Sequence, residues 1–185
     1  MATAADLLHA RGYASVGVEA LCQRAGVKKG SFYHFFRSKH ALTLAALDWH
    51  WRKTTELVLE PAFRDDLPPI QRLGRFFDLL AKVQAATKKR TGQVRGCPFG
   101  NLSGEMSSQD ERIRRKLRQI FQAIASYFEG ALREAIAAGD LPGIDPAMNA
   151  QALVAYMEGI LLVATAENDP ALITRLGRKA IQLVT

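Results

Sequence analysis

The chain is poor in cysteine, with only Cys22 and Cys97 among its 185 residues. Two cysteines cannot form the disulfide framework of a small secreted domain, and no secretory signal peptide opens the chain. The longest apolar runs, such as residues 160–166, are well short of the roughly 18 residues that a membrane-spanning helix needs. We therefore expect a cytoplasmic protein with no membrane partner.

Patterns of catalytic and metal-binding sites are also missing. No glycine-rich phosphate loop is present. The four histidines lack the spacing of paired metal ligands: His9, His34, His40 and His50. Glu105 and Asp110 fit no catalytic arrangement and are interpreted as ordinary surface carboxylates. We expect no enzyme activity, no metal and no cofactor.

No segment alternates apolar and polar residues with a surplus of β-branched side chains, so we expect no sheet. Apolar residues recur instead at helical spacing between proline and glycine breaks. About nine helices are predicted: three within residues 1–36, then residues 40–60, 69–88, 96–107, 109–138, 146–167 and 170–184. Residues 88–93 are interpreted as a basic turn, and Asp145 as an N-cap that precedes a proline at the first helical position.

Residues 18–42 carry the most distinctive pattern. A short apolar-faced helix ends at Gly26, a residue that adopts the left-handed conformation without a steric penalty. A second short helix follows, and Ser38 is expected to cap the next one. The side chains expected to face inward are Val18, Leu21, Cys22, Ala25, Val27, Phe32 and Phe35. Two helices joined by such a turn occur in DNA-binding proteins and in ordinary bundles alike.

The outward side chains of the second short helix suit DNA. Lysines can neutralise phosphates or reach guanine edges, and hydroxyl and imidazole groups can donate to phosphate oxygens. Lys39 stands at the start of the following helix, where the helix dipole favours anions. The candidate DNA-binding residues are Lys28, Lys29, Ser31, Tyr33, His34 and Lys39.

Positive charge is concentrated in the same part of the chain. Residues 1–53 contain eight Lys and Arg against three Asp and Glu, whereas the remainder contains 17 against 15. A basic patch of this kind is the electrostatic footprint of a nucleic-acid-binding surface. A second basic cluster at residues 112–118 is interpreted as a solvated helix face.

The run AGVKKGSFYHFFRSKHALTLAAL, residues 25–47, resembles the signature of TetR-family transcriptional regulators, and the close match covers residues 7–47. The resemblance implies an all-α homodimer with a helix-turn-helix DNA-binding domain at residues 1–47 and a ligand-binding and dimerisation domain at residues 48–185. Family members carry a basic stretch before the first helix. This chain begins almost at that helix, so we expect a shortened N-terminus.

The function implied by the resemblance is a ligand-responsive regulator, most often a repressor. It would bind a pseudo-palindromic double-stranded DNA operator and leave it when a small molecule or electrophile acts on the C-terminal domain. By the family pattern, Lys28, Lys29, Ser31 and Tyr33 approach bases or phosphates, while Tyr33, His34 and Lys39 hold the DNA backbone. The alternative is a helical protein–protein interaction module without operator binding.

The last two predicted helices, the eighth and ninth, have apolar residues on more than one face, and such helices must bury the second face as well. TetR relatives pair these two helices across a two-fold axis, and the resemblance therefore implies a homodimer through them. Two recognition helices about 34 Å apart would meet successive major grooves. The residues concerned include Leu153, Met157, Ile160, Leu161, Ile173, Leu176, Ile181 and Leu183.

A small-molecule effector would need a mostly apolar chamber with a few polar groups. The candidate lining residues are Trp49, Phe76, Phe77, Cys97, Phe99, Asn101, Phe121 and Tyr156. Cys97 lies beside Arg95 and directly before Pro98 at a predicted helix start, a setting that favours thiolate and reaction with electrophiles or oxidants. Aromatic residues at helical spacing and free cysteines are also common in plain cores.

Overall fold

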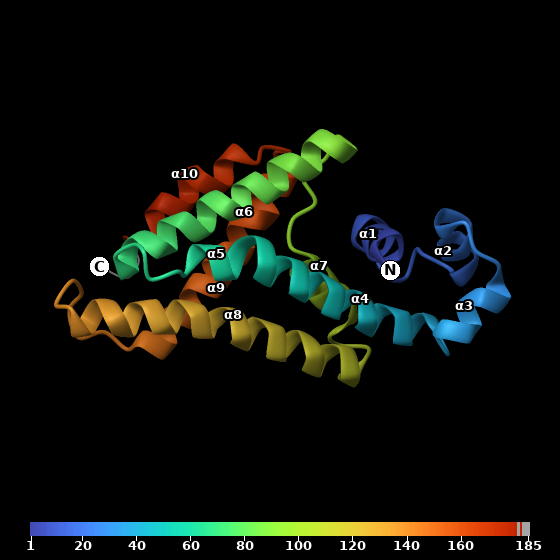
Figure 1. Cartoon of the computed structure of the whole chain (residues 1–185), viewed down its shortest axis with the longest axis horizontal. Coiled ribbons are helices and arrows are strands. Elements are labelled where there is room, and N and C mark those ends of the chain that lie inside the picture. Colours follow the sequence, from blue (N-terminus) through green and yellow to red (C-terminus); the bar gives the residue numbers. More distant parts are fainter. Residues whose placement is uncertain (181, 183–185) are drawn as a thin grey trace. The chain divides into compact units, whose positions relative to one another are not determined.

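The structure is a computed structural model that describes residues 1–180 and 182. Every regular element within these residues is helical, and no strand occurs among them (Figure 1). The helices are α1 (Ala2–Arg11), α2 (Val18–Ala25), α3 (Lys29–Phe35), α4 (Lys39–Thr54), α5 (Glu60–Ala62), α6 (Pro69–Thr91), α7 (Pro98–Met106), α8 (Glu111–Ala137), α9 (Pro146–Ala166) and α10 (Ala171–Ala180). A π-helical turn, η1 (Thr55–Leu59), joins α4 and α5 into one run. The all-α class with about nine helical segments is confirmed.

The chain forms two compact units. The first combines Met1–Lys53 with Pro98–Arg118, and the second combines Thr54–Cys97 with Gln119–Thr185. The sequence predicts a division at residue 47 instead, because it treats the domains as consecutive. In the structure α7 packs against α1, which brings residues 98–118 into the N-terminal unit.

Helix ends follow from local capping chemistry. The Ser38 hydroxyl accepts a hydrogen bond from the Ala41 N–H at 3.1 Å, as predicted. Asp145 accepts from the N–H groups of Ala147 and Met148 at 3.0 and 3.1 Å, as the sequence also indicates. The prediction of a basic turn at residues 88–93 is partly wrong. Residues 88–91 form the last turn of α6, because the left-handed residue that ends the helix is Gly92, with φ 79°.

The core of the first unit is built from α1, α2, α3 and α4. Its buried side chains include Leu21, Cys22 and Phe32, as predicted. Three other predicted core residues are exposed: Ala25, Val27 and Phe35, the last with 75% of its surface accessible. Phe36 packs against the core instead of Phe35. It lies four residues after Phe32 and has left the helix into extended backbone, with φ −133°.

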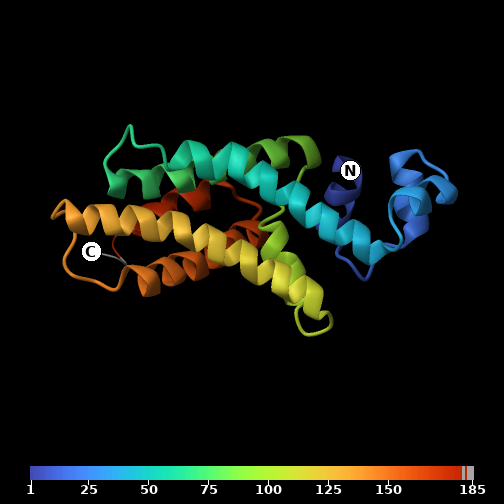
Figure 2. The same ribbon diagram turned by 60° about the horizontal axis from the view of Figure 1, so that its bottom comes forward.

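The core of the second unit contains a cluster of aromatic rings from α6, α8 and Phe63, the residue that follows α5. Phe76 lies edge-on to Phe128, with ring centroids 4.9 Å apart, and Phe63 contacts both of them and Tyr127. Figures 1 and 2 both show α10 beside α6 and α9, which are its main contacts. The predicted final helix extends to residue 184, but residues 181 and 183–185 lie outside the described part of the chain.

The helix α9 is the most apolar of the chain. Over an 18-residue window its mean hydropathy is 1.4, so by length and composition alone it could cross a membrane, a test that the core helix of a soluble protein also passes. This was not expected from the short unbroken apolar runs, because polar residues interrupt an otherwise apolar helix. Three of its large side chains are exposed in the protomer: Met148, Leu162 and Val163.

Candidate nucleic-acid interface

The turn between α2 and α3 has a defined hydrogen-bonding pattern. Gly26 has φ 67° and ψ 31°, the left-handed conformation that the sequence predicts there. Its N–H donates to the Gln23 carbonyl at 3.2 Å, while the Val27 N–H donates to the Cys22 carbonyl at 3.0 Å. These two bonds are those of a Schellman motif, which ends a helix and reverses the chain. The following helix, α3, is anchored by Phe32, which is buried on its inner face.

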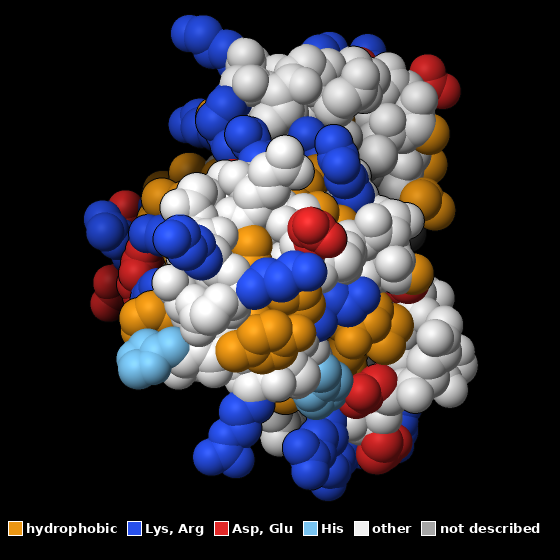
Figure 3. All heavy atoms as spheres, turned by 90° about the vertical axis from the view of Figure 1, so that its right-hand side faces the viewer, with side chains coloured by type: hydrophobic (Ala, Val, Ile, Leu, Met, Phe, Trp, Pro, Cys, Tyr) orange, Lys and Arg blue, Asp and Glu red, His pale blue; other side chains and the backbone are white. Residues whose placement is uncertain are grey.

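The outer face of α3 is polar and accessible. Lys28, Lys29, Ser31, Tyr33 and His34 are all exposed. Lys29 makes one long ion pair, 3.6 Å from Glu19, and both side chains remain largely in solvent. Viewed from the side on which α2 and α3 lie, the surface carries Lys and Arg side chains around exposed hydrophobic and His side chains (Figure 3). Exposed lysines beside hydroxyl and imidazole groups suit contact with phosphates and base edges.

Lys39 differs from the other five candidates. Its ammonium group donates to the Tyr13 carbonyl at 3.0 Å and lies 4.0 Å from the centroid of the Tyr13 ring. The cation therefore joins the start of α4 to the chain segment after α1. Burial and the charges of Asp110 and Glu105 raise the pKa of the Tyr13 hydroxyl, so this ring stays neutral at ordinary pH.

Glu105 on α7 holds the same segment from the other side. Its carboxylate accepts hydrogen bonds from the Tyr13 N–H at 2.7 Å and the Ala14 N–H at 2.6 Å. Gly12 precedes these residues with φ 79°, and a Cβ there would lie 3.0 Å from a Glu105 carboxylate oxygen. The prediction of an ordinary surface carboxylate at Glu105 is therefore wrong. Nothing in its own neighbourhood in the sequence points to a partner 92 residues away.

Asp110 also has a structural role that the sequence did not indicate. Its carboxylate accepts from the N–H groups of Arg112 and Ile113, both at 2.9 Å, and so caps α8. It also lies 3.0 Å from Nε2 of His40. The backbone bond from Ile113 is the main reason why the pKa of Asp110 is lowered. The carboxylate therefore joins the starts of α4 and α8.

Comparison with known proteins decides the family. The family described as "Bacterial regulatory proteins, tetR family" matches residues 1–46, and "Tetracyclin repressor-like, C-terminal domain" matches residues 69–180. The chain belongs to the TetR family. It is a helix-turn-helix transcriptional regulator, as the sequence predicts, and TetR-family regulators bind DNA operators and small-molecule effectors, usually as dimers.

Similarity to individual TetR-family relatives supports the same assignment. The chain is 37% identical over 162 residues to the transcriptional regulator AcuR of Cereibacter sphaeroides, covering 86% of this chain and 72% of AcuR. It is 31% identical over 156 residues to the transcriptional repressor DhaR of Mycobacterium sp. (strain GP1), covering 82% and 73%. A crystal structure of regulatory protein TetR from Rhodobacter sphaeroides superimposes with a TM-score of 0.86 at 32% identity, covering 100% of this chain and 96% of that one.

The predicted effector-binding residues of this TetR-family chain are divided between the two compact units. Trp49, Phe99 and Asn101 belong to the first unit, whereas Phe76, Phe77, Cys97, Phe121 and Tyr156 belong to the second. Phe76 and Phe77 pack edge to face within the aromatic cluster. The Tyr156 hydroxyl donates to the Leu176 carbonyl at 3.0 Å and so links α9 to α10. Several of these side chains therefore have clear packing roles.

Cys97 lies at the start of α7, with 7% of its surface accessible. Its thiol forms a hydrogen bond with the carboxyl group of Glu158 on α9. Burial raises the pKa of Glu158, and the bond to Cys97 opposes that effect in part. One Glu158 carboxyl oxygen is buried without a hydrogen-bond partner. The thiol thus faces a buried carboxyl group on α9.

Proposed function

We propose that the protein is a repressor that binds a pseudo-palindromic operator as a homodimer and leaves it when a small molecule acts on the second unit. The observation that carries this proposal is α3, a short helix held by a Schellman turn with its polar face free in solvent. Basic charge is concentrated in the same unit. The relative DhaR is named a repressor, which supports repression of transcription over activation.

Operator contact is made by Lys28, Lys29, Ser31, Tyr33 and His34 of α3, with Lys39 at the edge of the contact. The ammonium group of Lys39 already binds Tyr13. Lys39 therefore contributes to DNA binding by orienting the segment after α1. To contact a phosphate, its side chain would have to change rotamer. The first five side chains need no such change, because they are exposed.

Dimerisation uses α9 and α10. Large apolar side chains on α9 face solvent in the isolated protomer, namely Met148, Leu162 and Val163. Exposed apolar side chains on a helix of high mean hydropathy are the usual sign of a partner surface. A two-fold pair would set two α3 helices at the spacing of successive major grooves, about 34 Å apart.

The effector acts on the second unit near Cys97 and Glu158. A buried carboxyl oxygen without a partner is costly in free energy unless it is protonated or a ligand donates to it. The effector is therefore a small molecule with a hydrogen-bond donor, or an electrophile that reacts with the Cys97 thiol. Cys97→Ser separates these two cases: it abolishes operator release by quinones and aldehydes, and it leaves release by a non-covalent effector intact.

The deciding experiment is selection of operator sequences from random DNA by the full chain, followed by binding measurements at several salt concentrations. A pseudo-palindromic site bound with an affinity that falls steeply as salt rises supports the proposal. Failure to enrich any sequence supports the alternative, a helical protein–protein interaction module. The protein works in the cytoplasm, where its DNA partner is found, and no catalytic step is required.

A further inference from the structure

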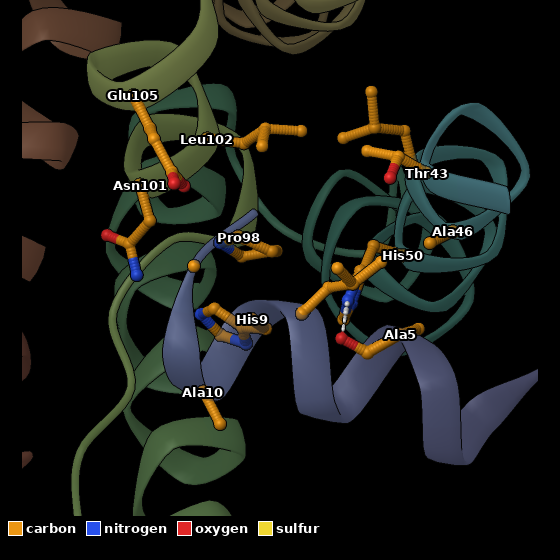
Figure 4. Close-up of a pocket in the computed structure, with 13 residues that line it drawn as sticks. Ala5, His9, Ala10, Thr43, Ala46, His50, Pro98, Asn101, Leu102 and Glu105 are labelled. Carbon is orange, nitrogen blue, oxygen red and sulfur yellow. Dashed lines mark hydrogen bonds between the residues drawn. The ribbon is translucent and has the colours of Figure 1, made fainter. Parts of the chain in front are cut away.

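A cavity of about 240 Å³ lies within the first unit, between α1, α4 and α7. Figure 4 shows His9 and Ala10 on α1 at its floor, Thr43, Ala46 and His50 from α4 on one side, and Asn101, Leu102 and Glu105 from α7 on the other. All the lining residues belong to one compact unit. Cys97 and Glu158, near which the effector is proposed to act, are not among the residues that line this cavity.

The Glu105 carboxylate and the Thr43 hydroxyl supply hydrogen-bond acceptors to this cavity, while Asn101 and the two histidines can also donate. The Glu105 carboxylate accepts two backbone N–H bonds, which use two of its roughly four lone-pair sites. The Thr43 hydroxyl donates to the Lys39 carbonyl at 2.9 Å, so what it offers a ligand is its oxygen lone pairs. An N–H or O–H group of an occupant could therefore donate to the remaining lone pairs of Glu105 and Thr43.

The charge of the cavity favours a cation. Among the described residues that line it, Glu105 is the carboxylate, none is Lys or Arg, and the other titratable side chains are His9 and His50. The His50 ring adds no positive charge at neutral pH, because burial lowers its pKa. Its Nε2 lies 3.4 Å from the Ala5 carbonyl oxygen, which can only accept, and this contact favours the neutral tautomer with its proton on Nε2.

The size of the cavity limits the ligand to about one ring. An apolar cavity of about 150 Å³ accommodates benzene, so about 240 Å³ accommodates one ring with a short polar arm. Most of the wall is apolar, with Leu8, Leu47 and Leu102 among its residues. We propose that this cavity binds a small organic monocation, one ring or a short chain that ends in an ammonium group, whose N–H donors share the Glu105 carboxylate.

Through this site a small molecule could act directly on the DNA-binding unit. A bound cation would contact α1, α4 and α7 together, and it would share the carboxylate that holds Tyr13 and Ala14. The inference goes beyond the proposed function, because it concerns binding to the first unit and remains testable even if the protein has no effector in the second unit.

Three compounds of equal size test the charge preference: benzylamine, benzyl alcohol and benzoate. Each is titrated into the full chain, with binding followed by calorimetry and by methyl NMR. We expect benzylamine to bind at least tenfold more tightly than benzyl alcohol and benzoate not to bind. Benzylamine should shift the methyl signals of Leu8, Leu47 and Leu102, and leave those of Leu153 and Leu161 in the second unit unchanged.

Two variants test the location. Glu105→Gln should weaken benzylamine binding at least tenfold and change benzyl alcohol binding less than about twofold. Ala10→Trp, at an exposed position on the cavity wall, should prevent both from binding. Glu111→Gln is the matched control on the exposed start of α8 and should bind benzylamine as the unaltered chain does.

The methyl shifts of the unaltered chain do not depend on whether the variants fold. Shifts confined to the second unit, or benzoate binding as tightly as benzylamine, would overturn the proposal. Equal benzylamine affinity in Ala10→Trp and the unaltered chain would do the same. None of these results would affect the operator selection that tests the proposed function.

Discussion

Gly177 on α10 lies directly against Phe77 on α6, so that a Cβ at position 177 would be 2.4 Å from the Phe77 Cβ. Both positions are buried. Even one methyl group here must push α10 away from α6, because the position of the Phe77 Cβ is fixed by its backbone and no change of rotamer moves it. We expect Gly177→Ala to lower the free energy of unfolding by about 1–3 kcal/mol, the usual range for overpacking a core, as measured by urea denaturation.

The matched control is Gly74→Ala in α6. A Cβ at Gly74 would meet nothing within 4 Å. Alanine there should stabilise the protein by about 0.4–1 kcal/mol, because it restricts the unfolded chain. Equal stability of the two variants would show that α6 and α10 pack less closely than this geometry requires.

Glu105 should matter for stability as well as for ligand binding. Glu105→Ala removes the acceptor of two backbone N–H groups, and hydrogen bonds to charged groups contribute about 1.5–3 kcal/mol each. Water can reach the exposed Ala14 N–H, so mainly the bond to Tyr13 should count, and we expect a total loss of about 2 kcal/mol. Amide hydrogen exchange of Tyr13 and Ala14 should accelerate, and unchanged exchange would contradict the contact.

Lysines on α3 should control the salt dependence of operator binding. Each phosphate contact that is lost reduces the slope of log affinity against log salt by about 1. Lys28→Ala and Lys29→Ala should each lower the slope by that amount if the ammonium groups contact phosphates. Fluorescence anisotropy on the selected operator measures the slope. Lys89→Ala, an exposed lysine at the end of α6 in the second unit, is the control and should leave the slope unchanged.

The stability of the second unit should depend on the protonation of Glu158. Burial raises its pKa, so the folded protein holds this proton more tightly than the unfolded chain does. The resulting stabilisation is present below the ordinary pKa of 4.5 and is lost as the pH rises through the folded-state pKa. The glutamine of Glu158→Gln cannot ionise. The free energy of unfolding of this variant should therefore exceed that of the unaltered chain by an amount that grows from pH 4.5 towards neutral pH. A constant difference across that range would count against a buried, raised-pKa carboxyl group.

The exposed face of α9 should be needed for dimerisation. Leu162 has 71% of its surface accessible in the protomer. Leu162→Glu would place a charge in the proposed interface, and we expect sedimentation to show mainly monomer and the operator affinity to fall at least tenfold. Leu57→Glu changes a leucine that is 52% accessible on η1, outside the interface, and should remain dimeric.

Most of the helices and their caps follow from the sequence because they depend on nearby residues. Gly26, Ser38 and Asp145 act on N–H or carbonyl groups within five residues of themselves, and apolar spacing indicates which segments are helical. The outward face of α3 could likewise be inferred from spacing.

Contacts between residues far apart in the sequence could not be inferred in the same way, and neither could the choice of which side chain at a helix end turns inward. Phe35 and Phe36 are adjacent aromatic residues, and only the extended backbone at Phe36 decides which of them turns inward. Glu105 depends on α7 packing against α1, an arrangement with no local signal. The effector candidates were chosen as aromatic residues on several helices, but helical spacing does not tell which of those helices share a compact unit.

The hydrogen bonds between Glu105 and the segment after α1 have an evolutionary consequence. The carboxylate binds the backbone of Tyr13 and Ala14, not their side chains, so the side chain at position 14 can vary without disturbing the bond. Gly12 is different, because its positive φ and the nearby carboxylate leave little room for another residue. Across related sequences, an acid at position 105 should therefore occur together with glycine at position 12, and lineages that lose the glycine should also lose the acid.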